Sequence, residues 1–262
     1  MLIVGEKING TIGRVREAVE AHDENFIVDL ARLQLENGAD VIDVNVGAGE
    51  DESENLAWAV RVIQKNLGIP LMLDSGNPDA LQAAMAEHQG RPILNSISGE
   101  EWKMEKLLPL VSKGNCSIVA LCMDDDGMPS SPAKTLNVAE KIVDRLTGAG
   151  VKREDIYLDP LVLSIATEFQ AAKMASDTLT LIRQNLSEVH TIMAISNISF
   201  GLPCRRLLNR AFLVATVVAG LDAFLVDVND KSLMATVWAA NLLSGNDEGC
   251  RSYLKAYRQG IL

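Results

Sequence analysis

The sequence predicts a single α/β domain folded as a (β/α)8 TIM barrel, and three observations predict it. The chain has 262 residues, close to the roughly 250 that such a barrel takes. Eight short segments rich in Val, Ile and Leu recur along it, separated by stretches with helical periodicity. Polar residues collect where these apolar segments end. We therefore expect one domain that covers residues 1–262.

The apolar segments are expected to be strands buried on both faces, because continuous β-branched runs are typical of parallel sheets covered by helices. In chain order they lie near residues 2–8, 40–46, 69–74, 92–97, 117–123, 156–162, 191–198 and 223–228. Pro70 and Pro92 stand at strand entrances, where a missing N–H costs least.

The intervening stretches are expected to be helices near residues 24–37, 52–66, 78–88, 101–113, 134–148, 170–186, 205–219 and 231–244. The periodicity of the first predicts an apolar stripe of Phe26, Leu30, Leu33 and Leu35. Gly38 should end this helix, since glycine adopts the left-handed conformation that closes many helices. The glycines at 148, 150 and 220 occupy similar positions.

Composition and charge exclude several classes of function. The formal net charge of −11 argues against a nucleic-acid partner, because phosphate binding needs clustered Lys and Arg. The amino terminus, MLIVGEKING, has no basic region followed by a long apolar stretch, and no apolar run reaches about 18 residues. We expect no membrane span and a cytoplasmic location.

Metal-dependent and nucleophilic chemistry are also disfavoured. The four cysteines form no CxxC pair, and the three histidines fall outside the strand ends where a barrel does its chemistry. The acidic run DDDG at 124–127 is no calcium loop, because the pattern would place its first ligand at Cys122. No metal site is therefore expected, and Cys204 is given no catalytic role.

The polar residues at the strand ends are the candidate functional residues. Every predicted strand contributes at least one: Glu6, Asn9, Asp43, Asn45, Asp74, Ser75, Asn95, Ser96, Asp124, Asp159, Asn197 and Asp227. Such groups are costly to bury without a partner, and in a barrel the carboxyl ends of the strands converge on one mouth. The alternative is that some of them cap the following helices. Asp43 and Asn45 are two residues apart and so face the same way, where they could brace the other polar groups.

Residues 194–213, AISNISFGLPCRRLLNRAFL, carry the most specific pattern. An apolar strand ends in Ser196, Asn197 and Ser199, meets Gly201 and Pro203, and opens into a helix near Arg205. The motif SNISFGLP-x-R-x-x-LN resembles the signature of the methyltetrahydrofolate-binding methyltransferases. This family includes the folate domain of cobalamin-dependent methionine synthase and the methyltetrahydrofolate:corrinoid protein methyltransferases. The resemblance extends over essentially the whole chain.

The resemblance assigns roles to four residues. In the family an Asp on the third strand, an Asn on the fourth and an Asp on the sixth hold the pterin, and these match Asp74 in LMLDS, Asn95 in ILNSIS and Asp159 in IYLDPLV. Asn197 matches the Asn that hydrogen-bonds near N5, the atom that carries the methyl group. The remaining candidates, Glu6, Asp43, Asn45, Ser196 and Arg205, would have supporting roles. Arg205 would shape the site beside the ring or the benzoyl-glutamate tail, or would be a surface residue at the start of a helix.

The resemblance implies methyl transfer between 5-methyltetrahydrofolate and the cobalt of cobalamin, a corrinoid held by a separate protein, in a direction that the sequence does not fix. Partners would be a corrinoid iron-sulfur protein or a small corrinoid protein, and the chain would form a homodimer. An amine is a poor leaving group, so Asn197 would favour the protonated form of N5. Two alternatives stay open: a dihydropteroate synthase-like enzyme, which would need a basic diphosphate site that AFLVDVNDKS does not offer, and a non-catalytic pterin-binding or corrinoid-docking subunit.

Overall fold

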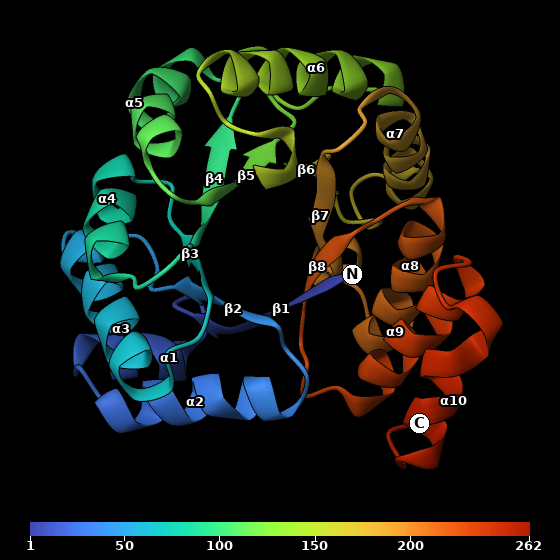
Figure 1. The fold of residues 1–262 in the computed structure, drawn as a ribbon, viewed down its shortest axis with the longest axis horizontal. Coiled ribbons are helices and arrows are strands. Elements are labelled where there is room, and N and C mark those ends of the chain that lie inside the picture. Colours follow the sequence, from blue (N-terminus) through green and yellow to red (C-terminus); the bar gives the residue numbers. More distant parts are fainter.

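The computed structural model describes all 262 residues and contains a closed barrel of eight parallel strands in sequence order, ringed by helices (Figure 1). The strands are β1 (Leu2–Asn9), β2 (Val41–Asn45), β3 (Leu71–Asp74), β4 (Ile93–Ser98), β5 (Ser117–Leu121), β6 (Ile156–Asp159), β7 (His190–Ala194) and β8 (Ala223–Val226). The predicted TIM barrel is therefore confirmed. No helix is both long and apolar enough to span a membrane.

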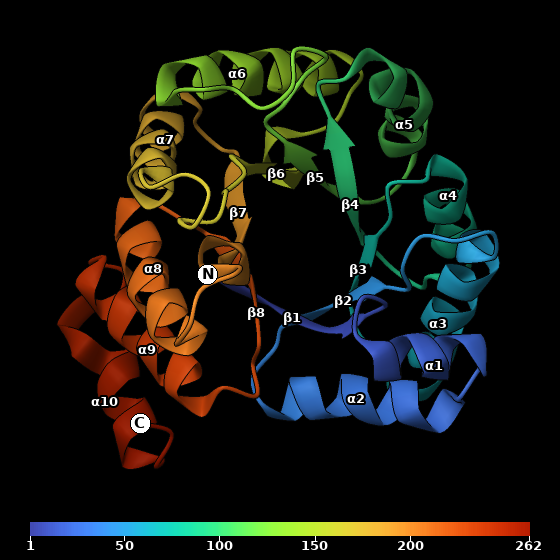
Figure 2. The same ribbon diagram turned by 180° about the vertical axis from the view of Figure 1, so that it is seen from behind.

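The outer ring follows the same alternation (Figure 2). Its helices are α1 (Gly13–Glu20), α2 (Glu24–Glu36), α3 (Glu52–Leu67), α4 (Pro78–Glu87), α5 (Glu101–Lys113), α6 (Pro132–Gly148), α7 (Ala171–Asn185), α8 (Arg205–Ala219), α9 (Lys231–Leu243) and α10 (Arg251–Arg258). Short 3-10 turns are η1 (Arg153–Asp155), η2 (Ile195–Ser199) and η3 (Glu248–Cys250). All eight expected helices are present, while α1 and α10 were not predicted.

Two expected strands end at least three residues earlier than the sequence suggested. The strand expected at 156–162 stops at Asp159, because Pro160 has no N–H to continue the ladder. The strand expected at 191–198 stops at Ala194, and Asn197 lies in the turn η2 instead. Short polar side chains favour such a turn, and here the Ser199 hydroxyl lies 3.3 Å from the carbonyl of Ser196.

The predicted apolar stripe of α2 is only partly confirmed. The face that packs on the barrel consists of Ile27, Val28, Ala31 and Gln34, whereas Leu33 is 45% exposed. Phe26, Leu30 and Leu35 pack only at its edge. The centre of the buried face thus includes a small residue, Ala31, and a polar one, Gln34, which a pattern of large apolar residues does not reveal.

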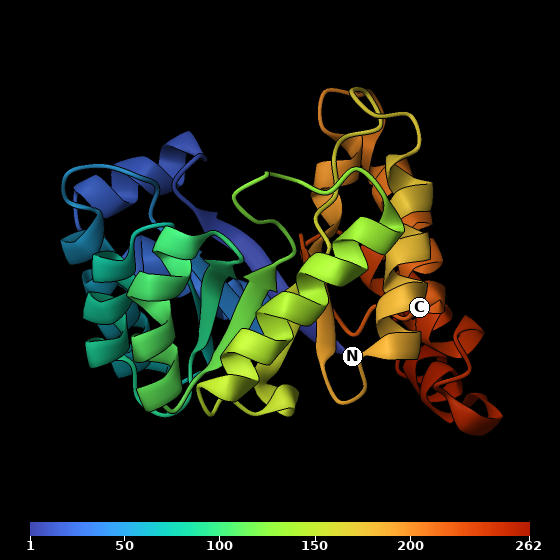
Figure 3. The same cartoon turned by 90° about the horizontal axis from the view of Figure 1, so that it is seen from above.

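The barrel interior is built in two layers. The lower layer is apolar and consists of Val4, Val41, Met72, Ile93, Val119, Ile192 and Ala223. Two residues further along the strands, on the same inward face, come Glu6, Asp43, Asp74 and Asn95. On β6, Asp159 stands two residues beyond the partly buried Tyr157 in the same way. A polar layer thus lies directly above the apolar one, towards the carboxyl ends of the strands, where the loops after β6 and β7 rise above the barrel (Figure 3).

Candidate active site at the barrel mouth

The centre of the polar layer is a group of four side chains from three neighbouring strands. Asn45 Nδ2 donates to Asp74 Oδ2 at 2.8 Å, and its Oδ1 accepts from the N–H of Gly47, which fixes the amide in one orientation. Asn95 Nδ2 lies 3.4 Å from Asp43 Oδ1. Asp74 and Asn95 are partners across the β3–β4 ladder. Asp43 and Asn45 therefore each contact one of the two residues expected to bind the substrate, as the predicted bracing requires.

The two carboxyl groups of this cluster resist ionisation. Burial raises the pKa of Asp43 well above its ordinary value, and the charge of Asp74 raises it further. Burial also raises the pKa of Asp74, against the lowering effect of the hydrogen bond from Asn45. Two buried acidic groups that interact lose their protons less readily than either would alone, so protonated carboxyl groups occur here at a higher pH than usual. The cluster can therefore offer both donors and acceptors to a bound ring.

Asp159 approaches the same space from β6, and it is bound only by its own loop. Its Oδ1 accepts from the N–H of Leu161 at 2.8 Å, and its Oδ2 has no hydrogen bond within the protein. Leu161 itself adopts a left-handed φ of 62°, where the chain turns after the strand. Burial raises the pKa of Asp159 to about 7. One carboxylate oxygen of Asp159 thus remains for a ligand, and the charge of this carboxyl group changes near neutral pH.

A second group of polar side chains lies between β1 and the loop after β7. The Ser196 hydroxyl donates to Glu6 Oε2 at 3.3 Å, while Arg205 donates to the Ser196 carbonyl at 2.8 Å and to the Ser199 hydroxyl at 3.1 Å. Ser199 in turn donates to Asn209 Oδ1 at 2.6 Å. Arg205 therefore holds the turn that carries Asn197. Burial raises the pKa of Glu6.

Asn197 itself is exposed and makes no side-chain hydrogen bond within the protein. The structure places it next to Ser196 on the rim of the mouth and does not join it to Asp74, Asn95 or Asp159. Its backbone carbonyl is held by the N–H of Phe200 at 3.1 Å. The side chain is thus free to turn towards a ligand while its backbone is fixed.

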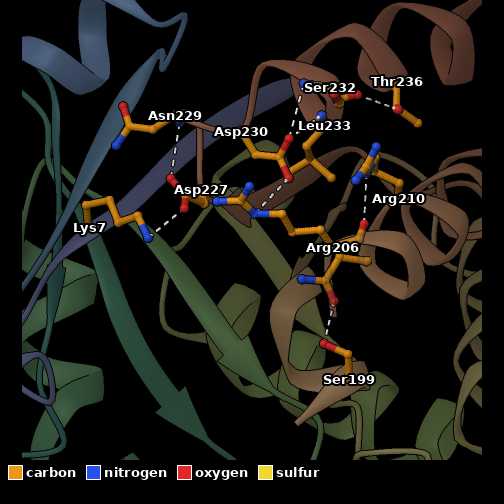
Figure 4. Close-up of polar contacts among 11 residues, drawn as sticks. Lys7, Ser199, Arg206, Arg210, Asp227, Asn229, Asp230, Ser232, Leu233 and Thr236 are labelled. Carbon is orange, nitrogen blue, oxygen red and sulfur yellow. Dashed lines mark hydrogen bonds and ion pairs between the residues drawn. The ribbon is translucent and has the colours of Figure 1, made fainter. Parts of the chain in front are cut away.

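Sequence reasoning missed Lys7, which forms an ion pair with Asp227 at 2.6 Å across β1 and β8 (Figure 4). Lys7, Glu6, Ser196, Arg205 and Asp227 line one cavity of about 210 Å³ at this side of the mouth. The sequence does contain a signal for Lys7: two consecutive charged residues, Glu6 and Lys7, within an apolar strand. Asp124 was predicted with the others but lies in a loop hairpin, where its carboxylate accepts from the N–H of Asp126.

Comparisons with known proteins identify the family of this chain. Residues 5–227 match the family described as pterin binding enzymes. The chain is 36% identical to the methylcorrinoid:tetrahydrofolate methyltransferase of Eubacterium limosum, over 99% of this chain and 97% of that one. It is 31% identical to the methionine synthase of Mycobacterium tuberculosis over 86% of this chain, which spans 20% of that longer protein.

Solved structures show the same fold at lower identity. A dihydropteroate synthase of Coxiella burnetii in complex with pteroic acid superposes with a TM-score of 0.65 at 13% identity, covering 92% of this chain and 94% of that one. A Yersinia pestis dihydropteroate synthase with a pterine-sulfa conjugate gives 0.64 at 17% identity, covering 93% of each chain. At these identities the likeness concerns the fold alone.

Proposed function

The chain belongs to the pterin-binding enzyme family, and we infer that it catalyses methyl transfer between N5 of 5-methyltetrahydrofolate and the cobalt of a corrinoid carried by a separate protein. One observation carries this inference. The relative named methylcorrinoid:tetrahydrofolate methyltransferase is 36% identical and aligns over nearly its whole length, so that no domain of that enzyme is missing from the alignment. Its name gives the direction from the corrinoid to tetrahydrofolate, and we propose the same direction here.

Asp74, Asn95 and Asp159 would bind the pterin. The ring offers an edge of alternating N–H donors and acceptors, which carboxylates and amides can pair. Asp159 has one carboxylate oxygen without a partner, and the raised pKa values of Asp43 and Asp74 favour a protonated carboxyl group that can donate. Asn45 and Asp43 would keep Asp74 and Asn95 in place, because each is hydrogen-bonded to one of them.

Asn197 would act on N5. The methyl group leaves or joins a nitrogen whose charge changes during the reaction, and an amide at hydrogen-bond distance favours one of the two states. Asn197 has the required freedom, because its side chain is exposed and unbonded while Ser196 and Arg205 hold the turn. The partner's cobalt supplies the site that accepts or donates the methyl group. In the direction that removes methyl from folate, N5 takes up one proton.

The partner would be a corrinoid protein, and the chain would form a homodimer. The methyl group must pass between proteins at the open mouth, so the partner must approach the loops that follow the strands. Corrinoid iron-sulfur proteins and small corrinoid proteins both satisfy this requirement. The homodimer rests on the family resemblance alone.

The dihydropteroate synthase-like alternative has less support. The structural likeness to such enzymes is at 13% and 17% identity, against 36% for the methyltransferase. Near the last strands, Lys7 is paired with Asp227, and Arg206 lies 3.7 Å from Asp230. These two groups already have acidic partners, and Arg205, which lines the same cavity, is bound to the Ser199 hydroxyl and the Ser196 carbonyl. This makes the cavity a poor site for a diphosphate.

The direct test is transfer between methylcobalamin and tetrahydrofolate in both directions, followed by the change in the visible spectrum of the corrinoid. The account predicts enzyme-dependent transfer with free or protein-bound corrinoid. A protein that binds the folate but transfers no methyl group to or from any corrinoid would instead be a binding subunit.

A further inference from the structure

Strand β1 breaks the usual alternation of side chains at Glu6 and Lys7. In a regular strand, consecutive side chains point to opposite faces of the sheet. Here both line the same cavity at the barrel mouth. The pairing of β1 with β2 shifts between Gly5 and Ile8, so Glu6 and Lys7 have no partner residue on β2. An irregularity of this kind re-aims side chains and often stands next to active sites.

A buried glutamine from helix α2 holds this irregularity. The Gln34 side chain is 0% exposed, and its Oε1 accepts from the backbone N–H of Lys7 at 2.8 Å. It thereby satisfies a donor that the ladder with β2 leaves free. Burying an amide is costly unless it is hydrogen-bonded, and the neighbouring residues of this helix face are apolar. This position would suit a hydrophobic residue if packing were its only task.

Gly5 is matched to Gln34. A Cβ atom at Gly5 would lie 2.6 Å from Gln34 Oε1, closer than real Cβ contacts allow. The glycine therefore makes room for the amide that binds the chain two residues later. Glycine inside a strand commonly marks such a close approach.

The consequence appears at the mouth. With β1 held in this form, Glu6 reaches Ser196, the neighbour of Asn197, and Lys7 reaches Asp227 (Figure 4). A regular strand would turn one of the two side chains away from the cavity. The arrangement of charge beside Asn197 thus depends on one backbone hydrogen bond made from outside the barrel.

We propose that Gln34 is a positioning residue for methyl transfer, which acts through the backbone of Lys7 to hold Glu6 against Ser196 and Lys7 against Asp227. The kinetic part of this proposal rests on the proposed function. The Gln34 side chain contacts neither substrate, because it extends from α2 to the outer side of β1. Its effect reaches the reaction only through the geometry of Glu6 and Lys7.

Gln34→Met tests the proposal against a matched control. Gln64 is a second buried glutamine, 6% exposed, on α3, and its Nε2 donates to the carbonyl of Ile69 at 2.6 Å ahead of β3, at the opposite end of the barrel. Both substitutions remove a buried amide and should lower stability. Gln34→Met should slow single-turnover methyl transfer by about 10- to 100-fold, since small displacements of groups around a reacting atom cost that much. It should also change the pH profile of the rate, while Gln64→Met leaves both at the wild-type level.

A conservative variant and a second readout complete the test. Gln34→Glu keeps an acceptor for the Lys7 N–H in both protonation states, but only the protonated acid also keeps a donor for the Leu30 carbonyl, which Gln34 Nε2 contacts at 3.4 Å, and avoids a buried charge. Its rate should therefore lie closer to that of the wild type at low pH than at high pH. Hydrogen exchange of the Lys7 amide should be slow in the wild type and faster in Gln34→Met. The exchange measurement does not require an active enzyme. A wild type without methyl-transfer activity would therefore refute the proposed function, while the exchange rates would still test whether Gln34 holds the Lys7 amide. A normal rate and pH profile in Gln34→Met, equal losses in Gln34→Met and Gln64→Met, or unchanged exchange at Lys7 would overturn the proposal.

Discussion

Asp159 should make folate binding depend on pH near neutrality. Burial raises its pKa to about 7, and one of its oxygens accepts only the Leu161 N–H. The proposed ligand presents N–H donors, which favour the carboxylate over the carboxylic acid. Binding should therefore require ionisation of Asp159, so that a proton is released when folate binds below the pKa.

The magnitude follows from the fraction of Asp159 that is ionised. With a pKa of about 7, roughly one tenth is ionised at pH 6 and roughly nine tenths at pH 8. The Kd for 5-methyltetrahydrofolate should thus be about tenfold higher at pH 6 than at pH 8. Asp159→Asn cannot ionise and can accept with one oxygen only, so it should bind about 1–3 kcal/mol more weakly at pH 8 and lose this pH dependence.

Isothermal titration calorimetry measures both quantities. Titrations at pH 6, 7 and 8 give the Kd, and repeating them in buffers of different ionisation enthalpy gives the number of protons released. About one proton per site should be released at pH 6 by the wild type and none by Asp159→Asn. A wild-type Kd that is constant from pH 6 to 8, with no proton release, would refute the reasoning.

The remaining predictions concern binding, stability, pH and assembly. Asp74→Ala and Asn95→Ala should each weaken methyltetrahydrofolate binding by about 1–3 kcal/mol, because each leaves a polar ring edge unpaired; unchanged calorimetric affinity in both would contradict the site. The pKa of Asp159 is raised in the folded protein. The free energy of unfolding should therefore contain a contribution from Asp159 that is complete below about pH 4 and is lost as the pH rises through about 7. This contribution is up to about 4 kcal/mol. Urea unfolding should show this loss in the wild type and a smaller loss in Asp159→Asn, where only the other buried acids, Asp43, Asp74 and Glu6, still contribute; an equal loss in both proteins would argue against the assignment. The rate of methyl removal from folate should fall as pH rises, because N5 takes up a proton; a rate that rises with pH would exclude this step. Sedimentation at micromolar concentration should find a homodimer rather than a monomer.

The sequence sufficed for the architecture because the barrel repeats one signal eight times. Each parallel strand is a continuous apolar run and each helix has its own period, so errors at single boundaries do not change the count. The polar layer was predictable for the same reason: Asp43, Asp74 and Asn95 follow buried residues on the same face by two positions. A polar side chain that interrupts each apolar strand at the same position can be recognised from the sequence alone.

The parts that escaped the sequence depend on contacts between distant segments. Gln34 interrupts an apolar helix face because its side chain binds the N–H of Lys7, and these two residues are 27 positions apart in the sequence. The turn at Asn197 was expected as strand because Ile195 and Ile198 are β-branched, and both are buried in the turn as well. Propensity is a weak guide where a short segment satisfies its polar groups locally.

Single-turnover methyl transfer by Asn197→Ala, with Asp74→Ala as its counterpart, tests the central claim most directly. If Asn197 acts on N5 while the reaction proceeds, its loss should lower the transfer rate by about 10²- to 10³-fold and weaken folate binding far less, because only interactions that are stronger in the transition state accelerate the chemical step. Asp74→Ala should show the reverse, with weak binding and a rate near that of the wild type at saturating folate. An Asn197→Ala enzyme that transfers methyl at the wild-type rate once saturated would contradict the account and make Asn197 a pterin ligand only.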